Sequence, residues 1–138
     1  MGGASTEALV EAGRYGYAHS CLTSESFPVR PSAAGGAREI VLLDVDHEVT
    51  ADEVLAEARR RGLERPTYED ALYFGSQHPE VQRERPVIFL HEPWEGFFGR
   101  RDVLCLWTNA GRREIGLEGF DARFRPDHRF AFLKPTDP

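Results

Sequence analysis

The chain has 138 residues, of which 41% are hydrophobic, and carries a formal net charge of −6. This length supports one hydrophobic core, and the hydrophobic fraction is too high for a disordered chain. No apolar run approaches the roughly 20 residues that a membrane-spanning helix needs. The acidic balance disfavours nonspecific nucleic-acid binding, which depends on neutralising phosphates. We therefore expect a protein that binds neither membranes nor nucleic acids.

The N-terminal residues and the cysteines indicate in which cellular compartment the protein is expected. Residues Met1 to Glu7 lack the basic start and apolar core of a secretory signal, so we expect a cytoplasmic location. There the thiols of Cys21 and Cys105 stay reduced. No C-x-x-C spacing occurs, which argues against a zinc ribbon or a thioredoxin-like redox site. Cys105 lies in an apolar segment and is predicted to pack as a small buried hydrophobe.

Residues 1–37 are treated as an N-terminal segment, and residues 38–138 as a single α+β domain. In the N-terminal segment we expect a short helix from Glu7 to Ala12 and a strand from Tyr15 to Ser20. Residues 31–36 are rich in glycine, alanine and serine and predict a flexible connection.

The first strand of the domain is predicted at Glu39 to Val45, and a helix follows it. The strand is apolar on both faces, which is typical of a central, buried strand. Thr50 and Glu53 match the capping box that begins a helix. Gly62 then supplies the left-handed residue that ends this helix.

A second helix is predicted after Thr67, which caps a first turn rich in acids, and the pair His78-Pro79 ends it. The rest of the chain is mainly strand. The expected strands are 86–90, 102–108, 113–117 and 129–133, with a tight turn at 109–112 that makes the middle two a hairpin. Helices that precede a run of strands indicate an α+β fold, in which two consecutive helices pack on a mostly antiparallel sheet.

Four polar residues follow the first predicted strand, namely Asp44, Asp46, His47 and Glu48. The Asp-x-Asp pattern resembles the first motif of haloacid-dehalogenase-like phosphatases. That chemistry needs a downstream lysine and then an acidic pair, whereas Lys134 is the only lysine, so we reject it. Carboxylates at alternate strand positions share a face and suit a hard cation. A small metal-dependent enzyme using these four residues is therefore the alternative hypothesis.

No other motif for catalysis or metal binding is complete. His91-Glu92 begins like the zinc motif H-E-x-x-H, but the second histidine is missing and Pro93 opposes the helix that this motif requires. Neither glycine-rich phosphate-binding pattern occurs. The preferred hypothesis therefore includes no metal site and no cofactor.

Aromatic and arginine residues gather in the loop from Glu92 to Arg101 and at the following hairpin turn. These residue types dominate interface hot spots. The candidate binding residues are Trp94, Phe97, Phe98, Arg100, Arg101, Asn109 and Arg112. The loop either caps the core or presents a binding patch. We favour a non-catalytic binding or interaction module whose partner is another protein or a small ligand, and the oligomeric state stays open.

Several short motifs together form a pattern over roughly residues 22 to 134. They are Thr50-Ala51-Asp52-Glu53-Val54-Leu55, Arg65-Pro66-Thr67-x-x-x-Ala71-Leu72-x-Phe74-Gly75, His78-Pro79-Glu80-x-Gln82-Arg83 and Pro86-Val87-Ile88. The pattern resembles a set of small uncharacterised bacterial proteins, and this resemblance implies no function.

The order of elements is also similar to the C-type-lectin-like fold in its formylglycine-generating-enzyme-type form. Those domains often open their second helix with Arg-Leu-Pro-Thr-Glu, which Arg65-Pro66-Thr67 with Glu69 matches in part. The copper-binding cysteine pair of that oxidase is absent, so the resemblance implies the fold and not the oxidase activity.

Overall fold

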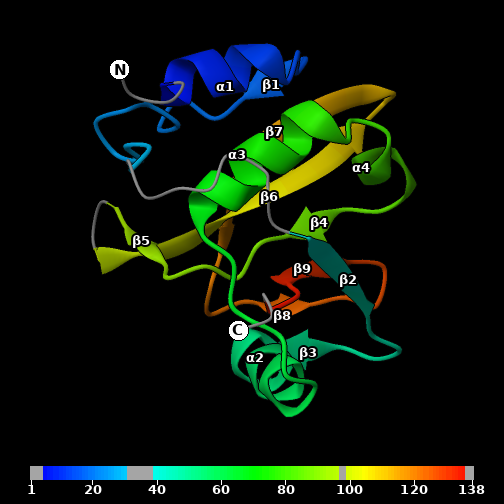
Figure 1. The fold of residues 1–138 in the computed structure, drawn as a ribbon. Coiled ribbons are helices and arrows are strands. Elements are labelled where there is room, and N and C mark those ends of the chain that lie inside the picture. Colours follow the sequence, from blue (N-terminus) through cyan, green and yellow to red (C-terminus); the bar gives the residue numbers. More distant parts are fainter. Residues whose placement is uncertain (1–4, 31–38, 97–98, 136–138) are drawn as a thin grey trace.

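The computed structural model describes residues 5–30, 39–96 and 99–135 (Figure 1). The helices are α1 (Thr6–Ala12), α2 (Ala51–Arg60), α3 (Tyr68–Gln77) and α4 (Val81–Glu84). The strands are β1 (Tyr17–Ala18), β2 (Ile40–Asp44), β3 (Val49–Thr50), β4 (Val87–Ile88), β5 (Trp94–Glu95), β6 (Arg101–Asn109), β7 (Arg112–Gly119), β8 (Arg123–Phe124) and β9 (Arg129–Leu133). Within these ranges, no helix has the length and apolar character needed to cross a bilayer.

The main sheet has the strand order β1-β7-β6-β4-β9-β2, and β5 pairs with β6 off this path. Most neighbours are antiparallel, but β1 with β7 and β4 with β9 are parallel. Strands β3 and β8 form a separate two-stranded sheet. The chain is therefore an α+β protein with a mixed, mostly antiparallel sheet.

The prediction of a central strand at Glu39 to Val45 is wrong, because β2 lies at the end of the sheet and pairs with β9. Its apolar residues on both faces have another cause. Val41 packs against the hydrophobic cluster on one side of the sheet, and Ile40 and Leu42 pack against the cluster on the other side. An edge strand that is covered on both faces has the same sequence pattern as a central one.

The two consecutive helices α2 and α3 lie on opposite faces of the sheet, and do not form the single layer that the sequence suggested. Val54 and Ala58 of α2 share a cluster with Ile88 of β4. Leu72 of α3 shares the other cluster with Val87, the neighbour of Ile88 on the same strand. Successive residues of a strand point to opposite faces, so the two clusters are on opposite sides. Figure 1 shows α2 beside β3 and β8, and α3 near α1 and β7.

Both predicted helix starts are confirmed. The Thr50 hydroxyl accepts a hydrogen bond from the Glu53 amide at 3.3 Å, and the Glu53 carboxylate accepts one from the Thr50 amide at 2.8 Å. Thr67 and Asp70 form the same capping box at the start of α3. Gly62 has φ +74° and ends α2 as predicted. Helix α4 and the short strands β3, β5 and β8 were not predicted.

The hairpin of β6 and β7 is also confirmed. Asn109 pairs with Arg112, and the two residues between them, Ala110 and Gly111, have φ values of 52° and 83°. Positive φ at both central positions is the geometry of a type I′ turn, which matches the twist of the flanking strands.

The N-terminal segment packs against α3 and the sheet, and α1 is confirmed with Ser5 as its cap. Phe27 has no exposed surface, and its ring centroid lies 5.2 Å from that of Tyr68 and 5.1 Å from that of Trp94. Arg30 donates two hydrogen bonds of 2.6 Å to the buried carboxylate of Glu69. The connection predicted at 31–36 lies outside the described residues.

Candidate functional site

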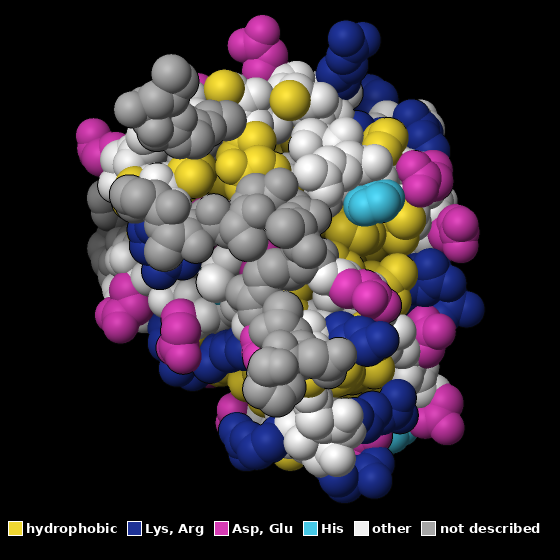
Figure 2. Space-filling view, viewed as in Figure 1, with side chains coloured by type: hydrophobic (Ala, Val, Ile, Leu, Met, Phe, Trp, Pro, Cys, Tyr) yellow, Lys and Arg dark blue, Asp and Glu magenta, His cyan; other side chains and the backbone are white. Residues whose placement is uncertain are grey.

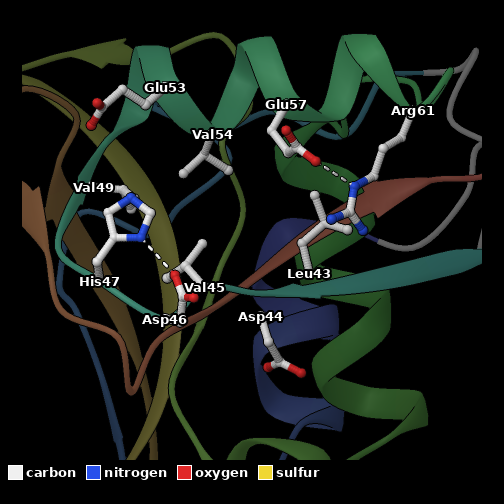
Figure 3. Close-up of a pocket in the computed structure, with 10 residues that line it drawn as sticks. All are labelled: Leu43, Asp44, Val45, Asp46, His47, Val49, Glu53, Val54, Glu57 and Arg61. Atoms are coloured by element: carbon white, nitrogen blue, oxygen red, sulfur yellow. Dashed lines mark hydrogen bonds and ion pairs between the residues drawn. The ribbon is translucent and has the colours of Figure 1, made fainter.

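A pocket of about 500 Å³ lies between α2 and the segment that joins β2 to β3 (Figure 3). It is partly open to solvent. Its lining consists of Leu43, Asp44, Val45, Asp46, His47, Val49, Glu53, Val54, Glu57 and Arg61.

Aliphatic side chains form the inner part of this pocket. Leu43 and Val45 alternate with polar residues along β2 and its continuation, so both turn toward α2, and Val54 faces them from that helix. Val49 at the start of β3 is buried beside them. None of these side chains carries a nucleophile, an acid or a base, so this inner part offers apolar contact alone.

The outer part of the pocket carries carboxylates. Asp46 accepts a hydrogen bond of 2.7 Å from His47, and this bond holds the pKa of Asp46 below its usual value. Hydrogen bonds from Thr50 lower the pKa of Glu53, and those from Arg60 and Arg61 lower that of Glu57. All three carboxylates are therefore ionised at neutral pH. In Figure 3, Asp46 and Glu53 lie at one end of the pocket, and Glu57 with Arg61 at the other.

The four polar residues proposed for a metal-dependent enzyme do not converge. Asp44 forms ion pairs with Arg85 at 3.3 Å and Arg129 at 3.1 Å, and Figure 3 shows it pointing away from Leu43. Glu48 pairs with Arg123 on β8 at 2.7 Å. Asp46 and His47 remain together. In the ranges that the structure describes, no group of three or more histidines, cysteines or acids is placed to hold a metal ion.

Trp94, the first of the candidate binding residues, caps the core. Its ring packs against Phe27 and lies over Gly96, where a Cβ atom would collide with it. Among the described residues, the large hydrophobic side chain that stands exposed is Tyr17, at 46%. Phe97 and Phe98 lie outside the described residues.

The polar members of the candidate binding surface are divided between the two ends of the long hairpin. Arg100 pairs with Asp102 at 3.0 Å, and Arg101 pairs with Asp121, both at the start of β6. Asn109 and Arg112 lie at the hairpin turn. The nine residues of β6 separate these ends by roughly 27 Å, at 3.4 Å per residue. The structure therefore does not bring the two groups into one contact surface.

Charges of both signs are mixed on the face of the molecule seen in Figure 2, outside the atoms drawn in grey. The described residues also form surface ion pairs, such as Arg65 with Glu92 at 2.9 Å. Such pairs leave little net field for steering a charged partner. The candidate site is therefore defined by its shape and local chemistry.

Sequence reasoning missed the contribution of α2 to the pocket. Glu53, Glu57 and Arg61 recur at four-residue intervals, which places them on one face of a helix. This spacing was visible in the sequence. The missing information was that this face lies beside the end of β2, which depends on tertiary packing.

His91 is a core residue, and its ring nitrogen atoms are not available to bind a metal ion. Its Nδ1 donates to the Glu92 carbonyl oxygen at 2.7 Å, and its Nε2 accepts from the Leu104 amide at 3.0 Å. Burial lowers its pKa to about 4, so the ring is neutral at pH 7. Both nitrogen atoms are therefore occupied by the backbone.

The fold and the pocket define an α+β protein with an open, ligand-sized depression beside α2. Comparison with known proteins found no matching family model, no similar curated protein and no similar solved structure. The resemblances to small bacterial proteins and to the C-type-lectin-like fold therefore stay predictions.

Proposed function

We propose that the protein is a non-catalytic binding module whose pocket beside α2 receives a small organic cation with an apolar body. The observation that supports this proposal most directly is the composition of the pocket. Its inner part is aliphatic, with Leu43, Val45, Val49 and Val54, and its outer part carries ionised carboxylates.

The size and the chemistry of the pocket agree with this ligand class. A volume of about 500 Å³ falls within the range of roughly 300–1,000 Å³ that is common for small-molecule sites. Burial of apolar surface provides the attraction, at about 25 cal/mol per Å². Asp46 is bonded to His47 and Glu53 to Thr50, but in the described residues neither carboxylate forms an ion pair with an arginine or lysine, so both can still attract an ammonium group.

Titration with three compounds of similar shape tests the proposal. We expect phenethylamine to bind more tightly than the neutral phenethyl alcohol, and phenylacetate to bind least, because only the amine carries a positive charge. Amide chemical-shift changes in ¹⁵N-labelled protein should centre on Val45 and Val49. Equal binding of the three compounds, or shift changes elsewhere on the molecule, would contradict the proposal.

Replacement Asp46→Asn is expected to weaken amine binding about threefold, which is the effect of removing one exposed, solvent-screened charge. Asp46 is 97% exposed at its side chain, so the substitution should leave the fold intact. Asp127→Asn is the matched control, because Asp127 is also an exposed acid followed by a histidine, His128, at 3.0 Å. The affinities are measured by the same chemical-shift titration, and equal weakening in both variants would refute a role for Asp46.

A further inference from the structure

A second pocket, of about 480 Å³, lies where the end of α1 meets the end of α3 and the start of α4. It is lined by Ala12, Gly13, Arg14, Ser76, Pro79, Glu80, Arg83 and Arg113. Its lining carries three arginines against a single acid. The three arginines come from segments that are far apart in the sequence, so the fold brings them together.

Arg113 is the buried member of this group, with 6% of its surface exposed. Its Nη1 donates to the Gly13 carbonyl oxygen. Its Nη2 donates to the Gly75 carbonyl oxygen at 2.6 Å and to Gln82 Oε1 at 2.8 Å. The guanidinium also lies 4.7 Å from the centre of the Tyr15 ring. Carbonyl groups at the ends of two helices thus hold this cation in one orientation.

One buried polar atom of a residue that lines this pocket, the Nε atom of Arg113, has no hydrogen-bond partner among the described residues. In addition, no carboxylate in the described ranges lies within ion-pair distance of Arg113, whereas buried charges are ordinarily paired. A buried cation without a counter-ion is an observation that points to a bound anion.

Arginines without a carboxylate partner are concentrated at this pocket. Most of the described arginines have a carboxylate partner, as Arg30 has Glu69 and Arg123 has Glu48. The described arginines that form no such pair are Arg14, Arg59, Arg83, Arg113 and Arg125. Three of them line this one pocket, in a chain whose overall charge is negative.

We propose that this pocket binds the phosphate group of a small phosphate monoester. The proposal is independent of the amine pocket beside α2. A phosphate monoester carries about −1.5 to −2 charges at pH 7, which balances the net charge of about +2 of the three arginines and Glu80. A guanidinium presents several donors in a planar fork, which suits phosphate oxygens.

Each arginine has a distinct role in this arrangement. Arg113 is fixed by the carbonyl groups, so it does not have to be ordered when the ligand binds. Arg14 and Arg83 are exposed and close on the phosphate from the sides of the pocket. Arg83 donates to the Gly111 carbonyl oxygen at 2.8 Å through Nη1, which leaves its other nitrogens for the ligand. The remaining volume takes the organic part of the ester.

Calorimetric titration at low ionic strength with inorganic phosphate, glycerol 3-phosphate and acetate tests the proposal. We expect saturable binding of both phosphate compounds, with the ester bound at least as tightly as phosphate, and much weaker binding of acetate. The side-chain Nε–H resonance of Arg113 should shift on phosphate addition. The absence of saturable phosphate binding at millimolar concentrations, or equal binding of acetate, would overturn the proposal.

Substitutions of two exposed arginines test whether phosphate binds in this pocket. Arg14→Gln and Arg83→Gln are each expected to weaken phosphate binding about tenfold, as the loss of a charge-assisted hydrogen bond does. Arg59→Gln is the matched control, because Arg59 is also exposed and unpaired but belongs to α2, and it should leave the affinity unchanged. If all three variants weaken binding equally, the interaction is nonspecific and the proposed site is refuted. Thermal unfolding of each variant verifies that it is folded.

Discussion

The replacement Phe27→Ala is expected to lower the free energy of unfolding by about 3–5 kcal/mol, the range for removing a large aromatic side chain from a core. Phe27 is fully buried between Tyr68 and Trp94, so the substitution leaves a cavity that neighbouring groups cannot fill. It also removes the contact by which residues 5–30 anchor on α3. The measurement is urea denaturation followed by tryptophan fluorescence.

The control for this prediction is Tyr17→Ala, which truncates a large aromatic side chain that stands 46% exposed on β1. Its effect should be below about 1 kcal/mol, because little apolar surface is returned to water. If Phe27→Ala is as mild as Tyr17→Ala, the N-terminal segment does not contribute to the core in solution.

Acidification is expected to destabilise the protein through His91. The pKa of this histidine is about 4 in the folded protein, below the value of 6.5 of a free histidine, because burial disfavours the charged ring. Between these two pH values the unfolded chain binds a proton that the folded protein does not bind. The stabilising contribution of His91 is therefore complete above pH 6.5 and falls as the pH is lowered toward 4, by about 3 kcal/mol in total.

The variant His91→Gln tests this linkage, since glutamine is not titratable and retains donor and acceptor atoms. Stability is measured by urea denaturation at several pH values between 4 and 7. The variant should be less stable at pH 7 but should lose less stability on acidification than the wild type. His78→Gln, which changes an exposed histidine, should leave the pH dependence of the wild type in place. Parallel pH profiles for wild type and His91→Gln would contradict the assignment.

Local signals in the sequence predicted the elements that are stabilised by nearby residues. The capping boxes at Thr50 and Thr67 and the left-handed residue Gly62 act within one helical turn, so a short stretch of sequence contains the whole interaction. The turn at 109–112 is equally local. Strands of two residues, such as β4 or β5, are too short to show a period, so the predicted bounds of β4 were too wide and β5 was not predicted.

Local sequence signals did not predict the tertiary arrangement. The sequence did not reveal that α2 and α3 cover opposite faces, because an apolar helix face does not specify which side of a sheet it meets. The position of β2 at the end of the sheet depends on β9, which lies some ninety residues later. No local pattern indicates that Leu9 and Phe27 join the cluster around α3, because those contacts form between segments that are far apart in the sequence.

In the candidate sites, too, the sequence reveals residues that are close along the chain but not those that the fold brings together. The sequence places Asp44, Asp46 and His47 in one polar cluster, and all three line the pocket beside α2, but Asp44 is paired with arginines from other segments. Arg14 and Arg113 have no common sequence pattern, and only the fold places them around one cavity. A site assembled from distant segments leaves no spacing for a motif search to detect.

The location of β2 at the border of the sheet also affects self-association. An unpaired strand edge is a template with which another chain can pair, and such pairing leads to aggregation. In this protein the edge strand has five residues and ends at Asp44, whose carboxylate is bound by Arg85 and Arg129. An incoming strand would have to strip water from this charged group, so the short edge discourages aggregation although its central residues are aliphatic.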